Sequence, residues 1–368
     1  MSHVNVSISG SRLDRLTSLR FFAALLVLGN HSTRDLTYVP HASELLTSGT
    51  VGVTFFFALS GFVLTWSHRE GDTPVAFTRR RFARVFPVHF VTWILAFPIL
   101  LVVGDTITGG EAIANLFLVQ SWNGDPHVYF GMNAVSWSLS AEVFFYLVFP
   151  FCLPLLLRTP RWALRGLLAV LVAGNLIAAS QLSAALSPET NRYVFYILPA
   201  YGLVSFLSGA VLARLMRTGL LVDVPVWAAG LLAACGYVLA HFDSHRLGGI
   251  GHGIENAVFL PFILILIGAA ATADLRQQPG FLTHPVALKL GEWSFALYMT
   301  HWLLLQALTA ALPDLDDLGI GVRVLVQVAF AVVAVALSAL VYTVVERPLE
   351  RRFRGGRPRS EMAVATQH

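Results

Sequence analysis

Long apolar runs, separated by short polar stretches, follow one another along most of the 368-residue chain. A bilayer core needs about 20 consecutive apolar residues per helix, and the pattern predicts ten such helices. The predicted spans cover residues 16–33, 50–67, 86–103, 137–157, 164–182, 194–214, 225–241, 256–273, 290–311 and 323–345. We therefore expect an all-α fold, a polytopic membrane bundle in which residues 1–350 form a single domain.

The composition agrees with a membrane protein. Hydrophobic residues make up 56% of the chain and charged residues only 12%, which is about half the charged share of a globular protein. The mean hydropathy is +0.67. Cys152 and Cys235 both lie inside apolar runs, so we interpret them as core side chains and not as a disulfide or metal ligands.

Three segments outside the predicted spans need a separate interpretation. The stretch 112–122 is apolar but too short to cross a bilayer, so we expect it to lie at the interface or to re-enter. The first apolar run lacks a small-residue cleavage site, and we expect it to stay as a membrane helix. Residues 351–368 are polar and basic, which predicts a disordered cytoplasmic tail.

Basic residues alternate between the connecting segments as the positive-inside rule describes. The segment 68–84 contains five arginines, whereas the next segment, 104–136, contains no lysine or arginine. Ten spans with both termini in the cytoplasm fit this alternation. Because topology accounts for the net charge of +4, we expect no nucleic-acid partner.

Ionisable residues bracket the first apolar run. Arg20 and His31 are eleven positions apart, which on a helix places them on nearly one face and about 16 Å apart along the axis. Ionisable groups are costly in lipid, so both are expected to face a protein-lined interior. The fourth span begins near Ser136 and Trp137 and contains Glu142, which the predicted topology places at a depth similar to that of His31.

A histidine beside a carboxylate is a general base held in one tautomer. The matching depth therefore predicts that Glu142 orients His31. The alternative is that His31 reaches external water and that Glu142 pairs with any nearby donor, and the sequence leaves both interpretations open.

Arg81 and Arg84 are three positions apart and share one helical face. Guanidinium groups match the geometry of phosphate oxygens, and with Arg20 on the same side three of them suit a polyphosphate ligand. The positive-inside rule explains the same charges without any ligand.

Ser294, Tyr298 and His301 form a polar stripe on one face of the ninth predicted span. Such a stripe lines a polar path or makes hydrogen bonds between helices, and the sequence favours neither. No HExxH, paired CxxC, phosphate-cradling glycine loop or GxSxG motif occurs in the chain, so we expect no bound metal or cofactor. The glycine-rich segment 248–253 is interpreted as a flexible external loop.

These motifs occur together and in order. Arg20 and His31 come first, then Arg81-x-x-Arg84, then the S-W-S-L-S-x-E run that ends at Glu142, and last the stripe from Ser294 to His301. In this combination the chain resembles the acyltransferase-three family of membrane O-acyltransferases. That family includes bacterial O-antigen, exopolysaccharide and Nod-factor acetylases and macrolide acyltransferases. The resemblance extends over about residues 12–350, with a departure at His89, where the family often has an aromatic residue.

The resemblance implies acyl transfer, by default acetyl transfer, from cytoplasmic acyl-coenzyme A to a hydroxyl of an envelope or exported carbohydrate. It also implies a multi-pass location in the bacterial cytoplasmic (inner) membrane. His31 and Glu142 would be catalytic, and the three arginines would bind the donor. The residues expected to contact the substrate or line its path are Ser136, Trp137, Ser294, Tyr298 and His301.

Two alternatives remain at this point. The acceptor can be a small secondary metabolite such as a macrolide, which would enter from the cytoplasmic side. Ten spans with buried charges also fit a transporter or a lipid-linked sugar flippase. The sequence has no glycine- or proline-broken helices in matching halves, which favours the enzyme.

Overall fold

The computed structural model describes residues 12–36, 42–68, 71–183, 185–246 and 252–353. Within these ranges every regular element is helical, which confirms the all-α prediction. The predicted loop at 248–253, as far as residue 251, and the predicted tail from residue 354 onward lie outside the described residues.

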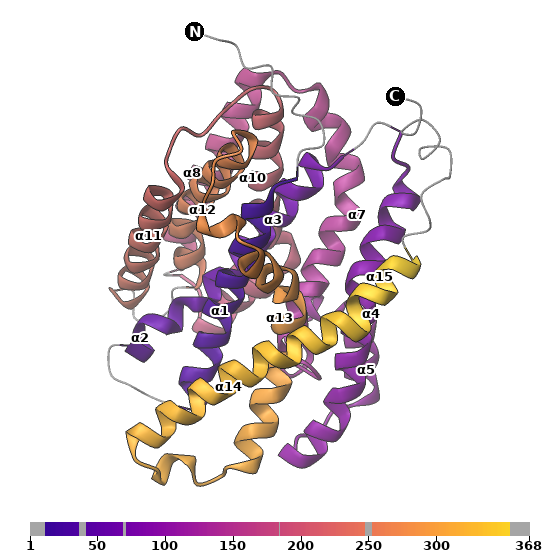
Figure 1. Cartoon of the computed structure of the whole chain (residues 1–368), viewed down its shortest axis with the longest axis vertical. Coiled ribbons are helices and arrows are strands. Elements are labelled where there is room, and N and C mark those ends of the chain that lie inside the picture. Colours follow the sequence, from indigo (N-terminus) through magenta and orange to yellow (C-terminus); the bar gives the residue numbers. More distant parts are fainter. Residues whose placement is uncertain (1–11, 37–41, 69–70, 184, 247–251, 354–368) are drawn as a thin grey trace.

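The longer helices correspond to the apolar runs (Figure 1). They are α1 (Asp14–Asp35), α3 (Val51–Trp66), α4 (Pro74–Val103), α7 (Trp137–Arg158), α8 (Arg161–Ser183), α10 (Pro199–Arg217), α11 (Val226–Arg246), α12 (His252–Leu275), α13 (Pro285–Ala311) and α14 (Ile320–Val341).

Short helices connect or extend them. They are α2 (Ala42–Leu46), η1 (Thr47–Thr50), α5 (Gly109–Leu116), η2 (Gln120–Trp122), α6 (Pro126–Tyr129), η3 (Ala134–Ser136), α9 (Pro188–Arg192), η4 (Tyr193–Ile197), η5 (Phe281–Thr283), η6 (Leu315–Asp317), η7 (Tyr342–Glu346) and α15 (Arg347–Phe353).

Seven helices in the described part of the chain are long and apolar enough to cross a membrane. They contain α3, α4, α7, α8, α10, α12 and α14, and they make the chain a multi-pass membrane protein. The other three predicted spans are also helical: α1 has 22 residues, α11 has 21 and α13 has 27. The total of ten crossings stays a prediction.

Several boundaries differ from those expected. Helix α4 begins at Pro74 rather than near residue 86, because Thr73 caps it by accepting a hydrogen bond from the Ala76 amide and Pro74 occupies its first turn. The predicted span 194–214 is broken, since a π-helical turn ends at Ile197 and a new helix begins at Pro199. The stretch 112–122 forms parts of α5 and η2.

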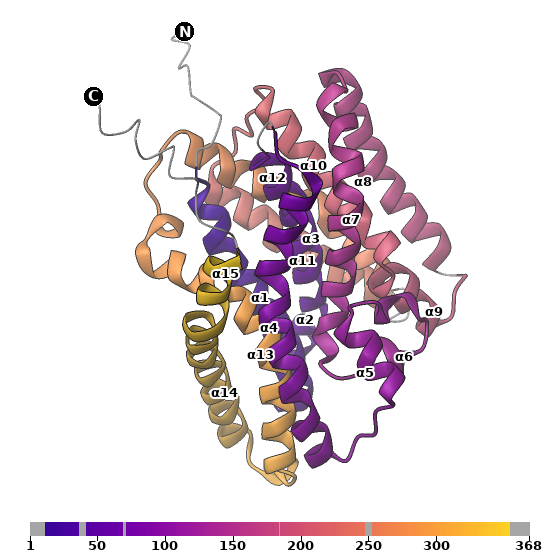
Figure 2. The same cartoon turned by 90° about the vertical axis from the view of Figure 1, so that its right-hand side faces the viewer.

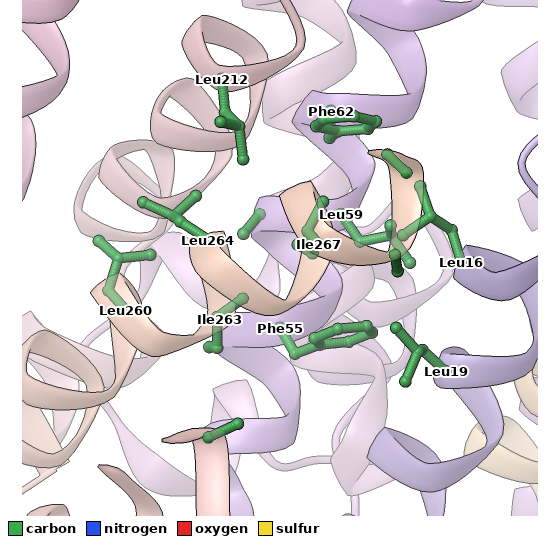
Figure 3. Packing of buried hydrophobic residues seen from close by; sticks show 14 of the residues in the cluster. Leu16, Leu19, Phe55, Leu59, Phe62, Leu212, Leu260, Ile263, Leu264 and Ile267 are labelled. Carbon is green, nitrogen blue, oxygen red and sulfur yellow. The ribbon is translucent and has the colours of Figure 1, made fainter. Parts of the chain in front are cut away.

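Helix α3 is central to the bundle. Its side chains Phe55, Leu59 and Phe62 pack against residues of α1, α10 and α12 (Figure 3). Helices α3 and α10 touch through backbone, because a Cβ added to Gly61 would lie 1.8 Å from the carbonyl oxygen of Phe206. Small residues allow such close approach in membrane bundles.

Burial separates central helices from peripheral ones. In the most apolar part of the helical stretch Ser43–Trp66, which contains α3, 72% of the residues are buried. In the corresponding part of α8 only 17% are buried. Helix α14 also lies on the outside of the bundle (Figure 2). It exposes large apolar side chains along its length, as expected of a lipid-facing helix. Cys152 and Cys235 are free thiols, but Cys235 is exposed on α11, so the prediction that it is a core side chain is wrong.

Candidate active site

A cavity of about 330 Å³ lies among α1, α3, α4 and α7. Arg20 of α1 and Arg81 and Arg84 of α4 line it, so the structure brings together the three arginines that the sequence groups. Glu142 and Tyr146 of α7 line the same cavity. We call it the arginine cavity.

The early start of α4 determines which arginines reach this cavity. Because the helix is already formed at Pro74, Arg81 and Arg84 share one of its faces. The Arg81 guanidinium lies 5.7 Å from the ring centroid of Phe77, within cation–π range. Arg79, from the same basic run, is exposed and does not line the cavity.

Glu142 belongs to the arginine cavity and not to His31. Its Oε1 accepts a hydrogen bond from Ser60 Oγ at 3.1 Å and another from the Tyr146 hydroxyl. Glu142 and Tyr146 are four positions apart on one face of α7, and that face points to the arginines. The prediction that Glu142 orients His31 is therefore wrong. Similar depth did not ensure that the two side chains face each other.

His31 meets a different partner, His301 of α13. His31 Nδ1 and His301 Nε2 are 2.9 Å apart, and the planes of the two rings are nearly parallel, with an angle of 7° between them. The Trp302 ring lies edge-on to His31, with 5.0 Å between centroids. His301 is fully enclosed, with 1% of its surface exposed, and its Nδ1 lies 3.0 Å from the Leu297 carbonyl oxygen.

A second cavity, of about 410 Å³, is lined by His31. We call it the histidine cavity. Its lining includes His31 and the aromatic residues Trp137, Tyr196 and Trp302. The charged residues of the lining are Arg34, Arg192, Asp35 and Asp105. It therefore combines aromatic surfaces with polar groups next to the imidazole of His31.

The two cavities meet at the junction of η3 and α7. Ser138 and Tyr298 line the arginine cavity, whereas Val135 and Trp137 line the histidine cavity. The Tyr298 hydroxyl lies 2.8 Å from Ser138 Oγ and donates a hydrogen bond to the Val135 carbonyl at 3.2 Å. The Tyr298 ring is also 6.0 Å from the ring of His301. This hydrogen-bonded layer separates the two cavities.

Two serines expected to contact substrate do not line either cavity. Ser136 is fully buried; it donates to the Asn133 carbonyl and accepts hydrogen bonds from Asn115 and Gln120. Ser294 donates to the Gly291 carbonyl in its own helical turn. Both hydroxyls are satisfied by structural hydrogen bonds, so their predicted placement on the substrate path is wrong. Trp137 lines the histidine cavity and Tyr298 the arginine cavity, whereas His301 lines neither and contacts His31 instead.

The sequence interpretation missed other residues of the site. Tyr146 follows Glu142 by one helical turn, and this spacing was the available signal. Tyr196 and Thr50 line the histidine cavity from η4 and η1, and nothing in their local sequence indicates this. Across the described ranges, no group of three or more His, Cys, Asp or Glu side chains is placed to hold a metal ion.

Residues 13–343 match the acyltransferase-three family, described as an acyltransferase domain. The chain belongs to this family. It is therefore an acyltransferase, and the match covers every residue that lines the two cavities except Arg12.

Three relatives are similar to this chain over nearly their full lengths. Acyltransferase MdmB of Streptomyces mycarofaciens is 32% identical, over 94% of this chain and 94% of the relative. Exopolysaccharide production protein ExoZ of Rhizobium meliloti (strain 1021) is 27% identical, over 88% of this chain and 98% of the relative. Nodulation protein 10 of Rhizobium leguminosarum bv. viciae is 27% identical, over 95% and 96%. No solved structure matches this acyltransferase-three chain.

Proposed function

We propose that this chain is a membrane O-acyltransferase, by default an O-acetyltransferase, that takes its acyl group from acyl-coenzyme A. The phosphates of the donor bind Arg20, Arg81 and Arg84 in the arginine cavity. The acceptor hydroxyl lies in the histidine cavity beside His31.

One observation carries this proposal: a single helix, α1, supplies Arg20 to one cavity and His31 to the other. The two residues are about 16 Å apart along that helix, a distance comparable to an extended pantetheine arm. A donor held by its phosphates at Arg20 can thus present its thioester near His31.

The reaction follows from these positions. His31 accepts the proton of the acceptor hydroxyl as the hydroxyl oxygen attacks the thioester carbonyl. The new ester C–O bond forms and the C–S bond breaks, and the coenzyme A thiolate then receives the proton from His31. Holding donor and acceptor together removes most of the entropic cost of their encounter.

The layer between the cavities must open for the arm to pass. The pantetheine arm replaces the hydrogen bond between Ser138 and Tyr298, and its amide groups can satisfy both hydroxyls. In the absence of donor the closed layer keeps water in the arginine cavity from the histidine cavity.

A carbohydrate is the acceptor that the histidine cavity fits best. Trp137, Tyr196 and Trp302 offer aromatic surfaces for a sugar ring, and Thr50 Oγ1 is a buried hydroxyl without a hydrogen-bond partner. The volume of about 410 Å³ lies near the lower end of the usual 300–1,000 Å³ for ligand pockets, which suits one or two sugar units. The printed name of ExoZ, an exopolysaccharide production protein, agrees with such an acceptor.

The bacterial cytoplasmic membrane is the proposed location. Acyl-coenzyme A is cytoplasmic, so the arginine cavity opens to that side, and both chain ends lie there too. The basic segment 68–84 precedes the cavity arginines of α4 and agrees with this orientation. Membership of the acyltransferase-three family removes the ground for the transporter alternative.

The decisive experiment measures thiol release from labelled acetyl-coenzyme A by the purified full-length chain, with a panel of methyl glycosides as acceptors. His31→Ala should lower acceptor-dependent release by about 10²–10⁴-fold, the usual contribution of a general base. Ser294→Ala, whose hydroxyl lies outside both cavities, is the matched control and should retain wild-type rates. Transfer by the His31 variant at the wild-type rate would refute the proposal.

The acceptor class needs a second measurement. Mass spectrometry of surface glycans from cells with and without the gene should reveal the loss of one acyl mass per modified sugar. Unchanged glycans, with an acylated small metabolite missing instead, would favour the macrolide-type acceptor.

A further inference from the structure

The contact between His31 and His301 defines where the protons of both rings lie. His301 Nδ1 is 3.0 Å from the Leu297 carbonyl oxygen. A carbonyl oxygen only accepts hydrogen bonds, so Nδ1 of His301 carries a hydrogen. In a neutral imidazole the other nitrogen, Nε2, is then an acceptor. A neutral ring is the form that suits a fully enclosed site, and in the described part of the chain the hydrogen-bond partners of His301 are the His31 ring and the Leu297 carbonyl, with no carboxylate among them.

The same argument extends to His31. Its Nδ1 is 2.9 Å from Nε2 of His301, and this contact needs one hydrogen between the two nitrogens. Because Nε2 of His301 is the acceptor, the hydrogen belongs to Nδ1 of His31. Nε2 of His31 therefore has a free lone pair, and His31 is a residue of the histidine cavity.

We propose that His301 is the positioning residue of the reaction, which holds His31 in the tautomer that can act as a base. This inference rests on the function proposed above. When His31 Nε2 takes the hydroxyl proton, the ring becomes an imidazolium and its Nδ1–H bond to His301 becomes charge-assisted. The proton then leaves Nε2 for the coenzyme A sulfur, and His301 keeps its own hydrogen throughout.

The role is one that a buried carboxylate has in the serine hydrolases, here taken by a neutral ring. The surrounding contacts hold that ring in place. The Leu297 carbonyl in the preceding turn orients it. The Asn133 side chain donates to the Met299 carbonyl at 2.8 Å, and the Tyr298 hydroxyl donates to the Val135 carbonyl of η3. The two ring planes are nearly parallel, and Nδ1 of His31 faces Nε2 of His301.

Two substitutions of His301 distinguish the need for a hydrogen-bond acceptor from the need for a side chain of similar size. His301→Gln places an amide oxygen near the position of Nε2, where it can accept the hydrogen of His31. His301→Leu fills similar space without an acceptor. We expect the Leu variant to lose about 10–100-fold in kcat, the usual cost of losing an orienting partner, with KM for acetyl-coenzyme A unchanged. The Gln variant should recover most of the rate.

The control is Ser294→Ala on the same helix, and membrane yield and thermal unfolding of each purified variant show whether it folds. Equal kcat for the Gln and Leu variants, or full activity of the Leu variant, would overturn the inference. If His31→Ala is inactive while His301→Leu is fully active, only the role of His301 fails. If His31→Ala is fully active, the proposed function fails as well.

A measurement on the wild-type chain avoids any folding defect. Diethyl pyrocarbonate reacts with unprotonated imidazole nitrogens, and peptide mass spectrometry locates the product. We expect His31 to be modified, with loss of activity, while His301 stays unmodified because it is enclosed and its Nε2 is engaged. Modification of His301 ahead of His31 would contradict the assigned tautomers.

Discussion

Arginines of one short run have different surroundings in this protein. Arg81 and Arg84 line the arginine cavity, whereas Arg79 is exposed on the same helix. Charge counting treats the three alike, since each satisfies the positive-inside rule. The face of α4 on which each side chain lies distinguishes them, because only Arg81 and Arg84 face the cavity in which acyl-coenzyme A is proposed to bind.

This difference leads to a matched test. Arg81→Ala or Arg84→Ala should raise KM for acetyl-coenzyme A by about 10–100-fold, because a hydrogen bond to a charged group contributes about 1.5–3 kcal/mol. Arg79→Ala removes the same charge from the same run and should leave KM unchanged. Steady-state kinetics at constant ionic strength measure the difference. An equal rise in KM for all three variants would indicate general electrostatic attraction of the donor and would contradict a specific binding site at Arg81 and Arg84.

The site residues were predictable only where one helix carries the information. The spacing of Arg20 and His31 gives their shared face directly from helical geometry. The partner of His31 is 270 positions away on α13, and no local pattern pairs the two. Similar depth in the membrane pairs Glu142 with His31 in the sequence prediction. The rotation of α7 about its axis instead turns the Glu142 carboxylate toward Ser60 of α3, and Tyr146 of α7 also bonds to it.

At the scale of elements, the site depends on how closely α1 and α13 approach. A Cβ added to Gly291 of α13 would lie 2.0 Å from the carbonyl oxygen of Thr17 in α1, so no larger residue fits without moving one helix. Those same two helices carry His31 and His301, and their separation therefore fixes the 2.9 Å contact between the rings.

Gly291→Ala should consequently force α1 and α13 apart. We expect a loss of about 1–3 kcal/mol in unfolding free energy, typical of overpacking, together with a fall in kcat. Gly166→Ala on α8 is the control, because an added Cβ there meets nothing within 4 Å. Thermal unfolding of both purified variants, alongside thiol release, checks the result. An unimpaired Gly291 variant would contradict the tight α1–α13 contact.

Helix positions followed from apolar periodicity better than helix ends did. The fourth predicted span, 137–157, agrees closely with α7 at Trp137–Arg158. The start of α4 was missed because residues 74–85 are basic, although the Thr73 cap and Pro74 mark a helix start. The break at Pro199 was readable in principle, since proline favours the first turn of a helix.

At the scale of the whole molecule, the proposal depends most on which side of the membrane the arginine cavity opens to. With Cys152 and Cys235 replaced by alanine, Arg79→Cys and His127→Cys place single exposed thiols near the start of α4 and beyond its end. In intact cells a membrane-impermeant maleimide should label the thiol at position 127 and spare that at position 79 until the cells are permeabilised. The reverse pattern would put the arginine cavity on the outer side and exclude a cytoplasmic donor.

Arg20 and His31 belong to one continuous helix, α1. This has a thermodynamic consequence for the binding of donor and acceptor. Any tilt or translation of α1 alters both cavities at once. The binding of one ligand therefore affects the affinity for the other. Reciprocity then requires that if a bound donor strengthens acceptor binding, a bound acceptor strengthens donor binding by the same factor. Titrations of each ligand with and without the other should yield one shared coupling factor, whichever ligand is added first.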